Sequence, residues 1–395
     1  MRLFVCDPAC VQAFGHNVTA LRYFTRAFRD QYSDIIPLCS NLLDHSVVKR
    51  ESFTAFYNFY YARYFPSVDT RGAPAPGASS DDAFYPDDFE RLATDDARRL
   101  LQSFQVGPDD DILFPHLDFY GVVGMLNALG ELELHARPRL LLRFIGVMEN
   151  ATITYRKPTA ELLSRVRAAM DHGIAVRVSA ETPRYADYLA IELGVTVAVT
   201  GYPDEADAMP MRADIPFTFY CPGSARFDKG FLELAQIFRG IRRGCGDLSI
   251  QFVTQILPDR DLKHHMNTLM QIYAIPGVEL QPAAIDAEDM VETFRRSHAV
   301  LLPYAADIYE FRGSAVLMEA TAYGRPAITY EGTAFAELVR YYGLGQVVAS
   351  PEAMVKAALD MAMQDRKTLE MQAAQARFRY IRDNIASYQF WMKRP

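Results

Sequence analysis

Short apolar runs alternate with segments of helical periodicity along the whole chain. This alternation predicts an α/β fold, because in such folds each parallel strand is followed by a helix that packs on the sheet. In the first half the runs predict strands at Leu3–Cys6, Ile35–Cys39, Ile112–Pro115, Leu140–Ile145, Ala175–Ser179 and Thr196–Val199. In the second half they predict strands at Phe217–Cys221, Ser249–Val253, Val278–Leu280, Ala299–Pro303, Ala327–Thr329 and Gln346–Val348. The pattern therefore predicts two doubly wound, Rossmann-like sheets.

Two irregular segments interrupt this pattern. Gly201–Asp214 is polar, contains proline and separates the two sets of strands, so we interpret it as a linker. Ser67–Asp88 is rich in glycine, proline, alanine, serine and aspartate, and we expect it to be a mobile excursion within the first set. It is either a lid over an acceptor site or a tolerated insertion.

Composition narrows the class of protein. A chain of 395 residues is long enough for two sizeable cores, and its net charge of −8 argues against a nucleic-acid-binding protein. The five cysteines are scattered, which favours a reducing compartment, and no spacing between them is typical of a zinc site. Asp7 and Pro8 end the first apolar run, so we interpret this run as a strand and not as a signal peptide. No apolar run approaches the roughly 20 residues that span a bilayer. We therefore expect a cytoplasmic protein.

A carboxylate, Glu319, lies within an otherwise apolar helical segment. Ser314 is a good N-cap, and Gly324 and Pro326 end the pattern, which predicts a helix over Ala315–Tyr323. The apolar neighbours of Glu319 in this segment offer it no cation, and burying an unpaired carboxylate is costly. A polyhydroxylated ligand is one candidate partner, and a solvated surface glutamate is the alternative.

Two cations lie near the predicted start of another helix. The apolar residues of this helix recur at Phe231, Leu234, Ala235, Phe238 and Ile241. Asp228 is the expected N-cap, which leaves Arg226 and Lys229 at the end of the helix where the dipole disfavours cations. A phosphate or diphosphate bound by these cations, Gly223 and backbone N–H groups would remove the conflict. Two solvated cations are the alternative.

Together these motifs resemble the donor-binding half of the retaining glycosyltransferases of family four, which have the GT-B fold. Gly223–Gly230 is similar to the family's glycine loop with its arginine and lysine, and Ser314–Pro326 is similar to its glutamate helix. The resemblance implies two Rossmann-like domains that face a cleft, with a C-terminal helix that crosses back to the N-terminal domain. The helical segment from about Leu369 to Trp391 is suited to this crossing, because it carries the apolar residues Phe378, Ile381, Ile385, Phe390 and Trp391. The implied domains are an acceptor-binding domain at 1–205, completed by about 375–395, and a nucleotide-sugar-binding domain at 214–374.

The resemblance also implies roles for individual residues. Arg226 and Lys229 would bind the diphosphate of the donor, and Glu319 would bind the ribose hydroxyls. The start of the glutamate helix would contribute donor-binding groups at Gly313, Ser314, Ala315 and Val316.

One departure from the family pattern leaves two interpretations of which residues form the sugar pocket. The family usually has a second glutamate separated from the first by seven residues, whereas eight residues lie between Glu310 and Glu319. In one interpretation the loop has an extra residue and Glu310 still reaches the donor sugar. In the other, Arg312 and the tyrosines Tyr304 and Tyr309 form a different pocket.

In the N-terminal half, candidate residues follow the predicted strands, because ligands of parallel sheets bind beyond the carboxyl ends of strands. This criterion selects Gly15, His16, His116, Asp118, Glu149 and Glu181. Gly15 and His16 resemble the glycine–histidine loop of the family, and His116 resembles a histidine found near the donor sugar. The alternatives are that His16 caps the following helix and that His116 is a satisfied core histidine.

The activity that the resemblance implies is transfer of a sugar, with retention, from a nucleotide-diphosphate sugar to a glycan, lipid-linked or other hydroxyl acceptor, as in bacterial polysaccharide or glycoconjugate synthesis. Arg226 and Lys229 would stabilise the leaving diphosphate, so we expect no cofactor and no bound divalent metal. Asp109–Asp111 precede a strand at its amino end, on the wrong side for catalysis. A nucleotide-sugar epimerase of the same fold and a non-catalytic nucleotide-sugar-binding protein are the alternatives, and product analysis separates them.

Aromatic residues are dense between Phe53 and Phe65. We interpret this segment as a helix core with an exposed flank, and an acceptor platform for carbohydrate is the alternative. An exposed flank would allow a peripheral contact with the inner face of a membrane that carries a lipid-linked acceptor. The oligomeric state is not predicted.

Overall fold

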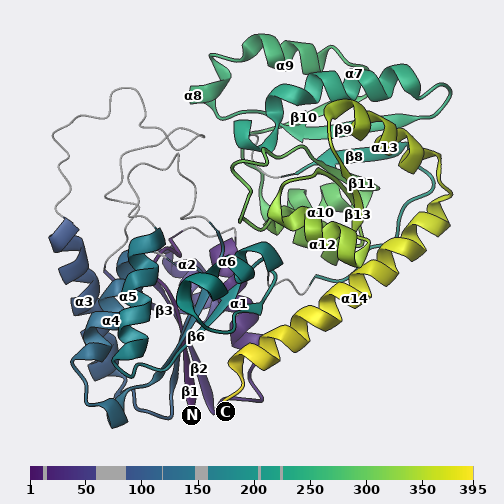
Figure 1. The fold of residues 1–395 in the computed structure, drawn as a ribbon. Helices are drawn as coiled ribbons and strands as arrows, with labels where there is room; N and C mark the ends of the chain where they lie inside the picture. Colours follow the sequence, from purple (N-terminus) through teal and green to yellow (C-terminus); the bar gives the residue numbers. More distant parts are fainter. Residues whose placement is uncertain are drawn as a thin grey trace. The chain divides into compact units, whose positions relative to one another are not determined.

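The computed structural model describes residues 1–11, 16–58, 86–117, 119–146, 159–202, 206–222 and 226–394. The chain divides into two compact units (Figure 1). Unit 1 comprises Met1–Pro203 and Ser387–Pro395, and unit 2 comprises Asp204–Ala386. Among the described helices, none combines the length and apolarity that a membrane span requires.

Unit 1 contains a seven-stranded parallel sheet in the order β3-β2-β1-β4-β5-β6-β7. The strands are β1 (Arg2–Asp7), β2 (Asp34–Ser40), β3 (Thr54–Tyr57), β4 (Asp111–Phe114), β5 (Arg139–Phe144), β6 (Val176–Ala180) and β7 (Ala198–Val199). The helices are α1 (His16–Ala27), α2 (His45–Glu51), α3 (Pro86–Ser103), α4 (Phe119–Gly130), α5 (Thr159–Asp171) and α6 (Pro183–Leu193). The strand order reverses between β1 and β4, which is the topological switch point of a doubly wound sheet.

Unit 2 contains a six-stranded parallel sheet in the order β10-β9-β8-β11-β12-β13. The strands are β8 (Phe217–Cys221), β9 (Ile250–Gln255), β10 (Val278–Gln281), β11 (Ala299–Leu302), β12 (Ala327–Tyr330) and β13 (Gly345–Val348). The helices are α7 (Leu234–Gly244), α8 (Asp259–Leu262), α9 (Met266–Tyr273), α10 (Ala287–Arg296), α11 (Ala315–Ala322), α12 (Ala334–Tyr342), α13 (Pro351–Met363) and α14 (Arg366–Met392). Here the order reverses between β8 and β11.

The central strands are apolar along their whole length because helices cover both faces of a parallel sheet. All residues of β8 are buried, and so are those of β5 and β11. Every strand predicted from the sequence is present. The pattern missed β3, because we interpreted the aromatic segment that begins at Phe53 as a helix. That interpretation is wrong for Thr54–Tyr57, where β-branched and aromatic residues form the edge strand.

The segments predicted to be irregular are only partly described. Residues 67–85 of the predicted excursion lie outside the described residues, and its last three residues belong to α3. The second part of the predicted linker packs on unit 2. The buried side chain of Arg325 donates hydrogen bonds to the carbonyls of Met209 and Pro210, and the N–H of Met209 donates to the carbonyl of Tyr323.

Helix α14 passes from unit 2 into unit 1, as Figure 1 shows for the long yellow helix. Its last turns join the core of unit 1, where Tyr388 and Trp391 are buried and the hydroxyl of Tyr388 donates a 2.6 Å hydrogen bond to the carbonyl of Gly201. The sequence predicted a terminal helix from about Leu369 to Trp391, with its apolar residues suited to such packing. Phe378, Ile385 and Phe390 depart from that prediction because they are exposed.

Candidate functional site

The switch point of unit 2 brings together two loops that carry most of the predicted donor-binding residues. Strands β8 and β11 are hydrogen-bonded neighbours in parallel register, so their carboxyl ends lie at the same edge of the sheet. The loop after β8 contains Arg226 and Lys229, and the loop after β11 leads to Ser314 and helix α11. Ligands of doubly wound sheets bind at this position.

Backbone contacts fix the two loops against each other. The N–H of Ala305 donates a 2.9 Å hydrogen bond to the carbonyl of Asp228. Gly230 has a φ of +77°, and a Cβ there would lie 2.1 Å from the carbonyl oxygen of Pro303. Both the left-handed backbone and the close approach require glycine. The turn that carries Arg226 and Lys229 is therefore held directly against the end of β11.

The prediction that Asp228 caps helix α7 is wrong. Two 3₁₀-helices, Phe227–Lys229 and Phe231–Glu233, precede the helix, which begins only at Leu234. The side chain of Asp228 is buried, and its Oδ2 accepts a hydrogen bond from Nη2 of Arg226 at 2.6 Å. A guanidinium is a stronger partner for a buried carboxylate than a backbone amide, which explains why Asp228 binds Arg226 and does not cap a helix.

Tyr309 completes this contact from the loop after β11. Its hydroxyl lies 3.0 Å from Nη2 of Arg226 and 3.2 Å from Oδ2 of Asp228, so that it accepts from the arginine and donates to the carboxylate. Its ring packs on Tyr304 at a centroid distance of 4.7 Å. The phenol thus holds Arg226 from a second direction. The sequence named Tyr309 only as one possible part of a sugar pocket.

Two buried polar atoms at this contact form no hydrogen bond within the described part of the chain. They are Nε of Arg226 and Oδ1 of Asp228. Buried polar groups in folded proteins are nearly always satisfied, so an exception needs an explanation. For Nε of Arg226, the explanation is a ligand atom that accepts its hydrogen bond.

Lys229 is half-buried, and its Nζ lies 5.8 Å from the centroid of the Tyr304 ring. Burial, followed by the charge of Arg226, lowers the pKa of Lys229 to about 8. The carboxylates of Asp228 and Glu319 act in the opposite direction. The protonated form is thus less favoured than in a solvated lysine, although it still predominates below pH 8, and a bound anion would raise the pKa again.

Glu319 therefore does have a cation in its surroundings. The sequence argument considered only the residues of its own helix, whereas Lys229 comes from the loop after β8. Glu319 is half-buried on α11, and its charge also contributes to the raised pKa of Tyr220 on β8, for which burial is the larger cause. The carboxylate thus lies near the two strands that form the switch point.

Helix α11 forms as predicted, with its N-terminus following the loop from β11. Ser314 is the N-cap, and its Oγ accepts a 3.1 Å hydrogen bond from the N–H of Leu317. The helix ends at Ala322, and Gly324 follows in a left-handed conformation. Ala315 and Val316 form the first turn. This geometry leaves the positive end of the helix dipole at the carboxyl edge of the sheet.

The remaining residues of the loop after β11 differ in their exposure. Arg312 and Gly313 are half-buried, and Cζ of Arg312 lies 5.8 Å from the centroid of the Tyr309 ring. Glu310 is exposed. These positions do not distinguish a sugar contact by Glu310 from a pocket formed by Arg312 and the two tyrosines.

The switch point of unit 1 contains a buried polar network that the sequence analysis identified only in part. His116 follows β4, is buried, and has its Nδ1 3.1 Å from Oδ2 of Asp7 at the end of β1. Nδ2 of Asn17 donates to both oxygens of the same carboxylate, at 3.1 and 3.0 Å, and the N–H of Ala9 donates to Oδ1 at 3.1 Å. Asp7 was not predicted, although a carboxylate directly after a buried strand was a signal that could have found it.

Other predicted residues have a structural role or lie outside the description. Glu181 forms a 2.9 Å ion pair with the fully buried Arg143, whose guanidinium also donates to the carbonyls of Pro115, Thr200 and Gly201. His16 is the first residue of α1, and its side chain is not described. The residues outside the described ranges are Gly15, Asp118, Glu149 and Gly223.

Two aspartates at the start of β4 form ion pairs at the amino edge of the sheet of unit 1. Asp110 binds Arg2 at 2.6 Å, and Asp111 binds Arg139 at 2.6 Å and Arg394 at 2.7 Å. These contacts join β1, β4, β5 and the end of the chain. The two carboxylates thus stabilise the edge opposite the switch point.

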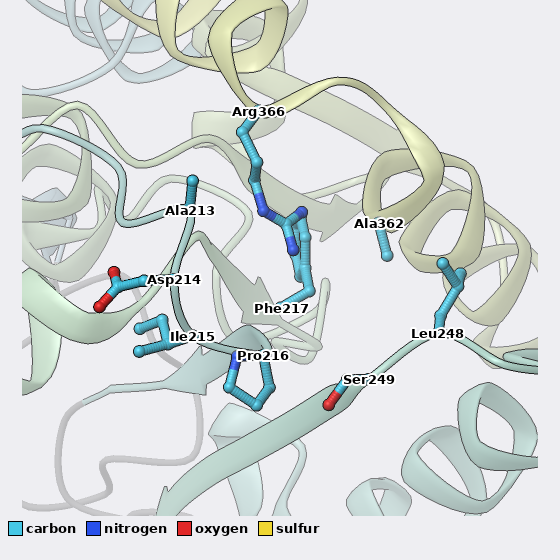
Figure 2. Close-up of a pocket in the computed structure, with 9 residues that line it drawn as sticks. All are labelled: Ala213, Asp214, Ile215, Pro216, Phe217, Leu248, Ser249, Ala362 and Arg366. Carbon is cyan, nitrogen blue, oxygen red and sulfur yellow. The ribbon is translucent and has the colours of Figure 1, made fainter.

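A hollow in unit 2 (Figure 2) lies at the amino ends of β8 and β9. The switch-point loops follow the carboxyl ends of β8 and β11, at the opposite edge of the sheet. It has a volume of about 360 Å³ and is lined by Ala213, Asp214, Ile215, Pro216, Phe217, Leu248, Ser249, Ala362 and Arg366. The guanidinium of Arg366 lies over the ring of Phe217, at 4.2 Å from the centroid. Because ligands of parallel sheets bind at the carboxyl edge, we do not assign the donor to this hollow.

No family model and no curated protein matches this sequence. Solved structures match it over nearly its whole length. A UDP-forming α,α-trehalose-phosphate synthase from Burkholderia vietnamiensis has a TM-score of 0.63 at 12% identity, covering 98% of this chain and 96% of that chain. The apo form of the lipopolysaccharide outer core galactosyltransferase WaaB has a TM-score of 0.61 at 12% identity, with 98% and 100% covered. A putative UDP-N-acetylglucosamine 2-epimerase from Listeria monocytogenes has a TM-score of 0.58 at 15% identity, with 100% and 98% covered.

At these identities, the similarity between this chain and the solved structures shows the fold alone. It confirms the predicted GT-B fold class.

Proposed function

We propose that this protein is a retaining glycosyltransferase, similar to those of family four, that moves a sugar from a nucleotide-diphosphate sugar to a hydroxyl acceptor. The observation that carries the proposal is the pair Arg226 and Lys229 at the switch point of unit 2. Nε of Arg226 is buried without a hydrogen bond among the described residues, and burial disfavours the charge on Lys229. A diphosphate satisfies both groups, because it offers several charged acceptor oxygens to a guanidinium and an ammonium.

The chemical step needs stabilisation of the leaving group more than it needs a protein nucleophile. As the bond between the anomeric carbon and the diphosphate breaks, negative charge grows on the diphosphate, and fixed cations stabilise it. In our proposal Arg226 and Lys229 donate hydrogen bonds to these oxygens. The leaving phosphate oxygen accepts the proton of the acceptor hydroxyl on the same face of the sugar, which gives retention. We assign no metal and no cofactor to this step.

The nucleotide would bind along the edge formed by α11. The N-terminus of this helix presents backbone N–H groups at Ala315 and Val316, and the helix dipole favours an anion there. Glu319 lies one turn further along and would accept hydrogen bonds from the ribose hydroxyls. Arg312 or Glu310 would contact the donor sugar.

We also assign His116 to the donor sugar, with Asp7 as its positioning residue. A carboxylate that accepts the Nδ1 proton of His116 leaves Nε2 of the neutral ring without a proton, so that Nε2 accepts a hydrogen bond from a substrate hydroxyl. Asn17 and the N–H of Ala9 hold the carboxylate in place. Asp7 therefore acts through the imidazole and not on the substrate.

A nucleotide-sugar epimerase is the second candidate, because a putative enzyme of that class has a similar fold. Such an enzyme needs the same diphosphate contacts but converts the donor sugar without an acceptor. A non-catalytic protein would bind the donor and leave it unchanged. The three candidates therefore predict different products from one incubation.

The experiment screens nucleoside diphosphates and their sugars by thermal shift, and then follows the products with and without glycan and lipid-linked acceptors. We expect one nucleotide to stabilise the protein by about 2.7 kcal/mol at a hundred times its Kd. We expect release of the nucleoside diphosphate to accompany transfer and to persist in EDTA. Isomerised donor without release would favour the epimerase, and binding without any product would favour the non-catalytic protein.

A matched pair of variants tests the site. Lys229→Ala should lose the thermal shift, whereas Arg243→Ala removes the same charge at the other end of α7, where the side chain is exposed, and should keep it. Equal shifts in both variants and wild type would contradict the proposed diphosphate site.

A further inference from the structure

The outer face of helix α14 has apolar side chains where a solvated helix face is normally polar. Met371, Phe378 and Ile385 are 57%, 65% and 45% exposed, respectively. They recur every seven residues and therefore lie about 10 Å apart along one side of the helix. The opposite side is buried, for example at Leu369, Ala376 and Tyr380. We call Met371, Phe378 and Ile385 the outer ridge.

Cations outnumber carboxylates around the outer ridge. The exposed charged residues of α14 are the cations Lys367, Arg379 and Arg382. The two carboxylates of the helix, Glu370 and Asp383, are half-buried, and Asp383 pairs with Arg382 at 2.8 Å. Asp365, just before the helix, accepts hydrogen bonds from Thr368. The ridge is thus cationic in a chain whose net charge is −8.

This pattern does not fit a second copy of the same helix. A coiled-coil seam needs two apolar positions in every seven residues, and the outer ridge supplies one. The exposed positions four residues after Met371 and Phe378 are Gln375 and Arg382. A symmetric pair of such faces would also place cations opposite cations.

We infer that the outer ridge of α14 is a docking surface for an anionic membrane. Widely spaced apolar side chains that enter the headgroup region, flanked by lysine and arginine, are the pattern of a helix that lies in the plane of the interface. Each cation near an anionic leaflet contributes attraction that salt weakens. The inference stands independently of the proposed glycosyl transfer, because none of these residues belongs to the switch-point sites.

The test is co-flotation of the full chain with vesicles of phosphatidylcholine alone or of equal parts phosphatidylcholine and phosphatidylglycerol. Wild type should float with the anionic vesicles, and the bound fraction should fall with salt. Phe378→Ser/Ile385→Ser should reduce the partition coefficient at least tenfold, and Lys367→Gln/Arg382→Gln should reduce it on anionic vesicles. The control, Leu134→Ser/Ile191→Ser, removes two exposed apolar residues of unit 1 and should float like wild type.

Thermal unfolding and the nucleotide-induced thermal shift accompany each variant. Both should match wild type, which separates loss of docking from misfolding and from failure of the proposed function. The inference is overturned if wild type does not float with anionic vesicles, or if the ridge variant floats as well as the control. A concentration-dependent dimer that the ridge variant abolishes, with no vesicle binding, would assign the surface to a second copy instead.

Discussion

Oδ2 of Asp228 lies 2.6 Å from Nη2 of Arg226, so a buried carboxylate already holds the cation that we assign to the donor diphosphate. The hydroxyl of Tyr309 binds both groups. The carboxylate binds Nη2, and Nε, on the same edge of the guanidinium, has no hydrogen bond among the described residues. Arg226 is therefore oriented before the ligand binds, and less side-chain entropy is lost on binding.

Replacement of Arg226 by alanine should have two separable effects. Loss of the guanidinium leaves Asp228 buried without its cation, which should lower the free energy of unfolding by about 1–3 kcal/mol. It should also weaken nucleoside-diphosphate binding at least about tenfold, because a charge-assisted hydrogen bond is lost. The double variant Arg226→Ala/Asp228→Asn should recover stability but not affinity. Chemical denaturation and calorimetric titration measure the two quantities.

A double variant that regains wild-type affinity would show that Arg226 only neutralises Asp228. Arg243→Ala, in the last turn of α7, controls for the general loss of a positive charge. It should change neither stability nor affinity.

Lys229 makes the binding of a nucleoside diphosphate depend on pH in a defined direction. Its pKa in the unliganded protein is lowered to about 8 by burial and by Arg226, and a bound anion raises it. Below pH 8 the lysine is charged in both states, and the affinity should be constant. Above pH 8 the free protein must take up a proton to bind, so the affinity should fall by up to about tenfold per pH unit.

Titration in two buffers of different ionisation enthalpy measures this proton uptake directly. The variant Lys229→Met should bind the nucleoside diphosphate more weakly than wild type. Its affinity should also stay constant above pH 8, over the range in which the affinity of wild type falls. A wild-type affinity that stays constant through this range would contradict a direct contact between Lys229 and the phosphates.

The strands of both sheets were predictable because a buried parallel strand leaves a continuous apolar run in the sequence. Phe217–Cys221 is such a run, and its predicted bounds match β8. The edge strand β3 was not predicted, because Thr54–Tyr57 is short and adjoins further aromatic residues. The local pattern of hydrophobic residues therefore did not distinguish a strand from a helix.

The candidate site was predictable only as far as local rules apply. Ser314 caps α11 as predicted, because a cap depends on residues within one turn. The partners of Asp228 were not predictable, since Tyr309 lies in another loop and only the sheet brings the two together. The cation near Glu319 was missed for the same reason.

Asp7 should control which nitrogen of His116 has the proton. Nδ1 faces a carboxylate that only accepts hydrogen bonds, so the neutral ring should be protonated at Nδ1. Asp7→Asn offers an amide that either donates or accepts, and it should shift the ring toward the Nε2-protonated form. Turnover should fall at least about tenfold, while the Kd of the nucleoside diphosphate should stay near wild type.

The ¹⁵N chemical shifts of labelled histidine report the tautomer, and this readout separates positioning from a general loss of structure. His116→Ala should reduce turnover to the level of the Asp7 variant. If Asp7→Asn leaves both the tautomer and turnover unchanged, Asp7 has only a structural role, with Asn17 and Ala9 as its partners.

Glu319 offers the sharpest test of the nucleotide assignment, because a ribose ligand and a structural carboxylate respond differently to one substitution. Glu319→Gln keeps the shape and one acceptor oxygen but removes the charge, so it should weaken nucleoside-diphosphate binding while thermal stability stays close to wild type. Glu292→Gln, on the exposed face of α10, is the matched control and should bind like wild type. Calorimetric titration with the nucleoside diphosphate and its 2′,3′-dideoxy analogue decides between the roles: wild type should prefer the ribose form, and the Glu319 variant should not. Equal affinity of wild type for both nucleotides would exclude a ribose contact, and a large loss of stability in the variant would indicate that Glu319 serves mainly as a partner for Lys229.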